Sequence, residues 1–89
     1  MQKKIIPLHQ IDENALFGNY LNGINAHELL CKLSNFGPVY LEGHDRYDTI
    51  YVDISKTNKP NLVKMFVMMS EHRPNEIEDI GHMIRFWWD

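Results

Sequence analysis

The sequence is poor in cysteine and in positive charge, and it has no long apolar run. Cys31 is the one cysteine among 89 residues, so no internal disulfide can form and no oxidising compartment is implied. Lysine and arginine total 9 against 12 acidic residues, a formal net charge of −3. This balance argues against direct nucleic-acid binding and against electrostatic membrane binding, because both need excess cations. The apolar runs are too short for a signal peptide or a membrane span, which predicts a soluble cytoplasmic protein.

Motifs of known catalytic and metal sites are also missing. There is no glycine-rich phosphate loop or nucleophile elbow, and the five histidines form no i, i+4 pair and no HExxH pattern. We therefore expect no enzyme activity, no metal and no cofactor. One alternative is a small enzyme using His44 with Asp45 or Asp48, since a histidine beside carboxylates can act as a general acid or base. The same segment, HDRYD, is also typical of a solvated turn.

The apolar content is sufficient for one small domain that spans residues 1–89. Hydrophobic residues make up 44% of the chain and aromatic residues 11%, which supports a single core. No internal repeat, linker or low-complexity segment is visible in the sequence.

The first half of the chain predicts one strand and two helices. Residues 3–9 are expected to form an edge strand, because Pro7 cannot donate a hydrogen bond within a sheet. Residues 12–23 and 25–33 have apolar positions at helical spacing, each after a capping residue. Gly37 is expected to end the second helix in the left-handed conformation.

The sequence also predicts the burial of one cysteine and of one or more methionines. Cys31 lies next to the apolar face of the second helix and is expected to be a buried, inert thiol. At least one of Met65, Met68 and Met69 is expected in the core.

The second half predicts a β-hairpin, a third helix and a last strand. Residues 39–43 and 49–55 are expected to pair through the HDRYD connection. In the second of these strands, Ile50, Val52 and Ile54 should face the core, whereas Thr49, Tyr51, Asp53 and Ser55 should face water. The third helix should bury Leu62, Val63, Phe66 and Val67, and a short helical turn should precede a last strand after Gly81.

These elements predict an α+β fold in the order β-α-α-β-β-α-β. An antiparallel-rich sheet of about four strands, with helices packed on one face, would bury every apolar stripe. This arrangement is close to a split βαβ unit of the ferredoxin-like type.

Charge is segregated along the chain. Residues 42–53 carry four acids against Arg46, and residues 71–89 carry five acids against two arginines, whereas residues 54–70 carry three lysines and no acid. Trp87 and Trp88 cannot both point inward from one strand, because side chains alternate.

Aromatic side chains among carboxylates predict a surface that binds a basic protein. The residues expected on it are Tyr40, Glu42, Asp45, Tyr47, Asp48, Tyr51, Asp53, Trp87 and Asp89. The predicted function is a small acidic inhibitor that occludes a basic nuclease or another nucleic-acid-handling enzyme. Immunity proteins and phage-encoded inhibitors of bacterial defence nucleases are of this kind. The alternative is a regulatory or scaffold subunit that forms a homodimer through a sheet edge or through Trp87 and Trp88.

Overall fold

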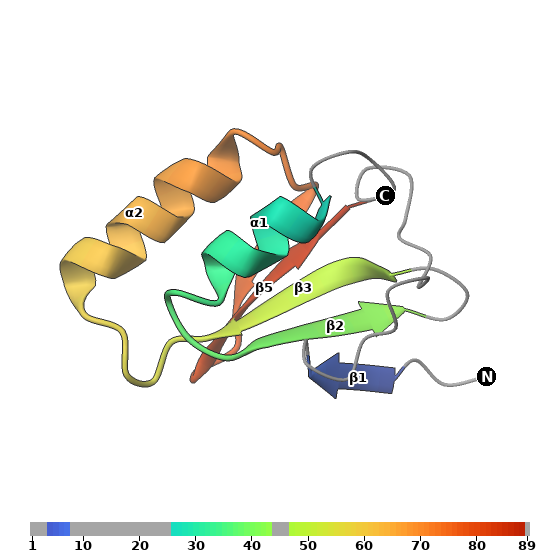
Figure 1. Ribbon diagram of the computed structural model, residues 1–89, viewed down its shortest axis with the longest axis horizontal. Coiled ribbons are helices and arrows are strands. Elements are labelled where there is room, and N and C mark those ends of the chain that lie inside the picture. The colour runs from blue at the N-terminus through green and yellow to red at the C-terminus, as the bar shows by residue number, and fades with distance from the viewer. Residues whose placement is uncertain (1–3, 8–25, 44–46, 89) are drawn as a thin grey trace.

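In the part of the chain that the structure describes, two helices cover one face of a five-stranded sheet, which makes an α+β fold (Figure 1). The computed structural model describes residues 4–7, 26–43 and 47–88. In chain order the elements are β1 (Lys4–Pro7), α1 (Ala26–Leu33), β2 (Val39–Gly43), β3 (Tyr47–Asp53), α2 (Lys59–Ser70), β4 (Glu76–Asp79) and β5 (Met83–Trp87). The predicted α+β class is confirmed. The helix expected over residues 12–23 lies outside the described residues.

The sheet has the order β1-β2-β3-β5-β4, and every neighbouring pair is antiparallel. Two antiparallel steps separate β3 from β4, so these two strands are parallel, with β5 between them. Because α2 connects them, β3, α2 and β4 form the expected split βαβ unit. The N-terminal half differs from the ferredoxin-like arrangement, since β1 and β2 are direct neighbours with no strand between them.

The core lies between the helices and the sheet. Leu29, Leu30 and Leu33 of α1 are buried, as their spacing predicts. From the sheet, Ile50 and Phe86 are fully buried at the centre of the core. The other buried residues of this cluster outside the helices are Val39, Leu41, Val52 and Ile84 in the strands, and Trp88 directly after β5.

The buried face of α2 agrees only in part with the predicted one: Leu62 and Phe66 pack against the core as expected, but Val63 and Val67 do not. Met65 and Met69 are fully buried, whereas Val63 and Val67 are each 60% exposed. Met65 and Met69 form one apolar stripe on this helix, and Val63 and Val67 form another with the same spacing. The sequence alone does not indicate which stripe faces the sheet. The flexible methionine side chains fill the core position, which confirms the expectation that at least one is buried.

The predicted helical turn before the last strand is wrong, because these residues form a β-hairpin. The hairpin joins β4 to β5 through a turn in which Gly81 has a φ of 98°, and the backbone N–H of Ile80 donates to the carbonyl of Met83 at 3.0 Å. All four residues of β4 are exposed. An exposed edge strand has no apolar alternation, so it leaves no period-2 signal in the sequence.

Two further expectations on α1 and its end are also wrong. Cys31 is exposed, because it lies one position beyond the buried face. Gly37 is not in the left-handed conformation. A Cβ atom there would overlap the carbonyl oxygen of Asp53, so the glycine allows a close approach of two backbone segments.

The structure reveals an internal repeat that the sequence does not show. The two segments α1-β2-β3 and α2-β4-β5 have the same order of elements and the same spacing between them. Their register matches at an offset of 36 residues. Leu41 pairs with Ile50, and adding 36 to each number gives Ile77 and Phe86, which also pair. Ile50 and Phe86 pair with each other, so an approximate two-fold axis passes between them.

The repeat extends into the helices. Leu29 and Leu33 correspond at this offset to Met65 and Met69, and all four side chains are buried. A serine that follows or ends each helix donates its hydroxyl three residues back, to the carbonyl of Cys31 in one repeat and of Val67 in the other. At this offset most positions carry different residues in the two repeats, which explains why the sequence alone reveals no repeat.

Candidate functional site

The candidate site is the face of the sheet opposite α1 and α2, which we call the distal face. Cross-strand partners lie on the same face of a sheet, so the register assigns its residues. Those with described side chains are Pro7, Tyr40, Glu42, Thr49, Tyr51, Asp53, Glu76, Glu78, Met83, Arg85 and Trp87. The centre of this face is closely packed, because Thr49 is fully buried and Tyr51 is 6% exposed. The prediction that both face water is therefore wrong.

A chain of polar contacts crosses the distal face from β2 to β4. The hydroxyl of Tyr51 donates to Oε1 of Glu42 at 3.0 Å. Tyr51 lies opposite Arg85 in the register. The guanidinium of Arg85 then donates to Oε2 of Glu76 at 3.1 Å and lies 3.6 Å from Oε2 of Glu78. Four strands are thus joined through one tyrosine and one arginine.

The two central groups of this chain keep their protons at neutral pH. Burial raises the pKa of the Tyr51 hydroxyl, and its hydrogen bond to Glu42 raises that pKa further, although Arg85 opposes this shift. Burial alone would lower the pKa of Arg85, but the hydrogen bond to Glu76 and the contact with Tyr51 raise it overall. Tyr51 is therefore a neutral donor and Arg85 a fixed cation, and neither serves as a general base near pH 7.

Asp53 lies at one end of the distal face, where β3 ends. The side chain and the backbone N–H of Ser55 both donate to its Oδ1, at 2.7 and 2.9 Å. These hydrogen bonds lower the pKa of the Asp53 carboxyl. Asp53 consequently presents an ionised carboxylate whose position is fixed by a local turn.

The structure brings together five of the nine residues predicted for the binding surface: Tyr40, Glu42, Tyr51, Asp53 and Trp87. Asp48 is excluded from this face, because it occupies the alternate position of β3 and pairs through its backbone with Trp88. The Asp48 carboxylate accepts a hydrogen bond from the Thr49 hydroxyl at 2.8 Å. Asp45, Asp89 and the side chain of Tyr47 lie outside the described residues, as does His44 of the enzyme alternative.

The two tryptophans point to opposite faces, as the alternation predicts. Trp88 is 3% exposed, and its indole N–H donates to the carbonyl of His72 at 2.9 Å. Trp87 lies on the distal face and is half-buried. Trp88 is therefore a core residue, and the predicted dimer contact through both tryptophans is wrong for Trp88.

Sequence reasoning missed Arg85, the central cation of the distal face. Its guanidinium contacts the carboxylates of Glu76 and Glu78, while Glu42 and Asp53 lie elsewhere on the same face. The signal was present in the alternation of β5, where Arg85 and Trp87 occupy one face and Ile84 and Phe86 the other. The alternation alone does not reveal the ion pairs of Arg85, because their carboxylates come from β4, whose residues carry no strand pattern.

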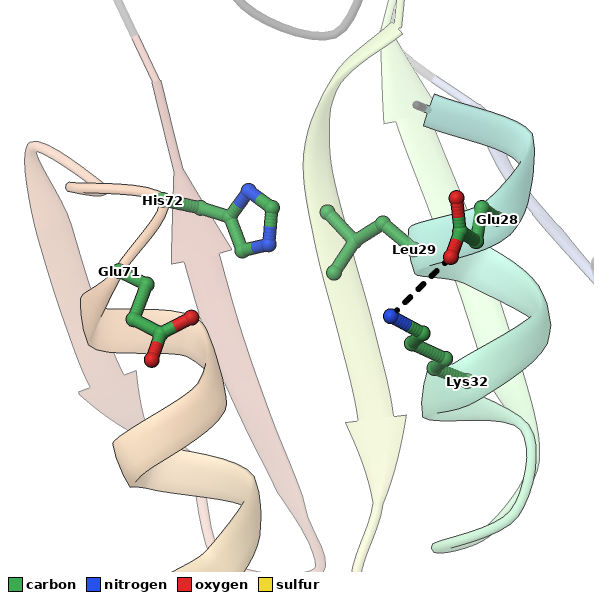
Figure 2. A pocket seen from close by; sticks show the side chains of 5 residues that line it. All are labelled: Glu28, Leu29, Lys32, Glu71 and His72. Carbon is green, nitrogen blue, oxygen red and sulfur yellow. Dashed lines mark ion pairs between the residues drawn. The ribbon is translucent and has the colours of Figure 1, made fainter. Parts of the chain in front are cut away.

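A separate pocket lies between the two helices and has a volume of about 220 Å³. Figure 2 shows Glu28, Leu29 and Lys32 on α1, with Glu71 and His72 beyond the end of α2. The ammonium group of Lys32 lies 3.2 Å from the carboxylate of Glu28, so these charges already compensate each other. The pocket offers no arrangement that matches a known catalytic site.

The part of the chain that the structure describes contains no candidate metal site and no candidate membrane-spanning helix. Within residues 4–7, 26–43 and 47–88, no three histidine, cysteine or acidic side chains are grouped so that they could hold a metal ion. In the same part of the chain, neither helix has the length and apolar character needed to cross a bilayer.

The raised pKa of Tyr51 gives a testable pH dependence. The pKa is higher in the folded state than its ordinary value of 10.0, so the stability that this proton contributes is complete below pH 10. It is lost as the pH rises through the folded-state value. We expect ultraviolet titration of the four tyrosines to show one that ionises late, and Tyr51→Phe to remove that step. A wild-type titration with all four tyrosines ionising near pH 10 would contradict the buried contact with Glu42.

In comparisons with protein-family models, curated proteins and solved structures, the chain matched none of them.

Proposed function

We propose that this protein binds a basic surface of another protein through its distal face and occludes it. The most specific form of the proposal is a cytoplasmic inhibitor of a basic nuclease or other nucleic-acid-handling enzyme. The observation that carries it is the clustering of Tyr40, Tyr51 and Trp87 with four carboxylates on one side of one sheet. The proposal assigns no catalytic activity to the chain.

The aromatic residues of the distal face suit a binding role. Trp87 and Tyr40 are half-buried, so each residue remains partly exposed to solvent. Tryptophan and tyrosine contribute strongly to protein interfaces, because they supply large contact area at low entropic cost. Tyr51 is nearly buried and bonded to Glu42, so it supports the surface from below.

The carboxylates suit a basic partner. The side chains of Glu76 and Glu78 are 59% and 58% exposed although both contact Arg85. Carboxylates displayed in this way attract a cationic surface at long range and occupy the positions that nucleic-acid phosphates take on such a partner. This attraction is screened by salt, so complex formation should weaken as ionic strength rises.

Asp53→Lys and Trp87→Ala are expected to weaken binding of the partner by about 2 kcal/mol each, roughly a 30-fold loss of affinity. The first change places a cation against a basic surface, and the second removes contact area. The measurement is the affinity of each variant for the basic protein that the wild-type chain retains at low salt. Tyr51→Ala is a poorer test, because Tyr51 is buried and its loss should also lower stability.

Glu71→Lys is the matched control for charge. Glu71 is exposed beyond the end of α2, away from the distal face, and the substitution changes net charge as Asp53→Lys does. The affinity of this variant for the basic partner should stay within about twofold of that of the wild type. Only the long-range effect of the changed net charge, which salt screens, should remain. Equal losses for Glu71→Lys and Asp53→Lys would show that binding depends on net charge and not on this face.

The alternative is a self-associating regulatory subunit, and one observation favours it. Val63 and Val67 are each 60% exposed and lie one turn apart on the outer side of α2. A dimer formed there should show a mass that depends on protein concentration and changes little with salt. Val67→Glu would abolish such a dimer and leave binding through the distal face intact.

A further inference from the structure

The outer edge of β4 corresponds in the internal repeat to an edge that β1 already covers. Within the described residues, β4 pairs with β5 alone and ends the sheet. Its equivalent at the 36-residue offset is β2, whose outer edge pairs with the antiparallel strand β1. Among residues 4–7, 26–43 and 47–88, the same fold unit therefore occurs twice, once with its outer edge covered and once with that edge open.

The hydrogen-bonding groups of β4 point toward this open edge. The N–H of Ile80 bonds to Met83 of β5. Because bonding direction alternates along an antiparallel strand, Glu78 is also directed to β5, whereas the N–H and C=O of Ile77 and Asp79 point outward. Leu41 is the equivalent of Ile77 in the first repeat, and it pairs with Ile6 of β1.

We infer that the edge of β4 binds an extended segment of a partner protein as an additional antiparallel strand, and that this segment alternates basic and apolar residues. This inference deepens the proposed function and rests on it for the basic character of the partner. Strand addition uses backbone hydrogen bonds for affinity and alternate side chains for specificity.

The repeat supplies the register, and the charges of β4 supply the sequence preference. By analogy with β1, four partner residues would lie in order opposite Asp79, Glu78, Ile77 and Glu76. The second and fourth would share the distal face with Glu78 and Glu76, so lysine or arginine is expected there. The third would lie beside Ile77, whose side chain is 47% exposed, so an apolar residue is expected.

A second copy of β4 fits this edge poorly. Antiparallel pairing of two β4 strands with Ile77 opposite Ile77 would place Glu76 of each copy opposite Glu78 of the other. Like charges directly opposite each other destabilise a strand pair. Charge complementarity thus favours a basic segment over self-pairing.

The test uses the full chain and a synthetic peptide with the sequence Val-Lys-Ile-Lys between short serine flanks. We expect saturable binding in which amide hydrogen exchange of Ile77 and Asp79 slows by at least about tenfold. N-methylation of the valine and isoleucine should abolish binding, because their N–H groups bond to β4. N-methylation of the two lysines keeps the same charge and composition, but their N–H groups point away from β4. This peptide should bind with an affinity within about threefold of that of the unmethylated peptide.

Ile77→Pro is the matched protein variant. It removes an outward N–H from an edge strand without removing a bond to β5, so the fold should persist. We expect it to lower peptide affinity at least about tenfold, whereas Ile77→Val should bind as the wild type does. Unchanged amide exchange in β3 and β5 would verify that the variant is folded.

Several outcomes would overturn the inference. The first is equal peptide binding by Ile77→Pro and the wild type, and the second is equal effects of the two N-methylated peptides on affinity. The third is amide protection of Ile77 that rises with protein concentration in the absence of peptide, because this would indicate self-pairing. The distal-face proposal is tested separately with the whole partner protein. If Asp53→Lys weakens that complex and Ile77→Pro does not, the edge inference fails and the proposed function stands.

Discussion

Replacing Gly37 by alanine is expected to lower the free energy of unfolding by about 2 to 4 kcal/mol. The new Cβ atom would overlap the backbone carbonyl of Asp53 and would also approach its carbonyl carbon. A backbone atom cannot move aside as the end of a flexible side chain can. The N–H of Asp53 also donates to the carbonyl of Pro38 at 2.9 Å, which holds the two segments together. Urea denaturation followed by circular dichroism would measure the loss.

Gly81→Ala is the control for this substitution. Gly81 has a φ of 98°, but no other atom lies within 4 Å of the position that a Cβ would occupy. Alanine there should cost about 1 kcal/mol for the unfavourable conformation alone. A cost for Gly37→Ala no greater than that for Gly81→Ala would contradict the close approach of residues 37 and 53.

Replacing Phe86 by alanine is expected to lower the free energy of unfolding by about 3 to 5 kcal/mol. Phe86 is fully buried, and its ring meets that of Phe66 edge to face at a centroid distance of 6.3 Å and an angle of 61°. It also lies opposite Ile50 on the approximate two-fold axis, where the two repeats join. Loss of this side chain should therefore weaken both repeats together.

Phe86→Leu fills most of the same volume and should cost about 1 kcal/mol. Both Phe86 variants should unfold in a single transition, since the central pair is shared by the two repeats. Two separate transitions for Phe86→Leu would show that the repeats fold independently. A cost below about 1 kcal/mol for Phe86→Ala would mean that the ring is not at the centre of the core.

The strands and helix with strong apolar periodicity could be predicted from the sequence. Residues 39–43 and 49–53 place apolar residues at alternate positions, residues 83–87 are rich in aromatic and β-favouring residues, and the buried leucines of α1 recur at helical spacing. In each case one face of the element is buried, so burial imposes a period on the sequence.

Elements and positions without such a period could not be predicted. β4 is exposed at every residue, so its pairing with β5 gives no pattern. Along α2 two apolar stripes compete, and only the tertiary packing selects Met65 and Met69 over Val63 and Val67. The requirement for Gly37 comes from a backbone segment 16 residues away in the chain, which local turn preferences do not reveal.

The candidate surface was predictable to the extent that strand alternation decides it. Tyr40, Glu42, Tyr51, Asp53 and Trp87 share the distal face because each occupies the expected position of its strand. The burial of Tyr51 could not be predicted, because it depends on which side chains the neighbouring strands place beside it. In the register these are Tyr40 and Arg85. A residue at the centre of a sheet face can be buried although that face carries charges at its rim.

The central claim is that the distal face binds a basic protein. The most direct test compares two columns, one with the wild-type chain and one with the double variant Asp53→Lys, Trp87→Ala, both loaded at low salt with lysate of the organism's own cells and of a candidate host. The account predicts that the wild-type column alone retains one basic protein in stoichiometric amount, and that rising salt releases it. The same proteins on both columns, or none on either while the free chain forms a dimer, would contradict it.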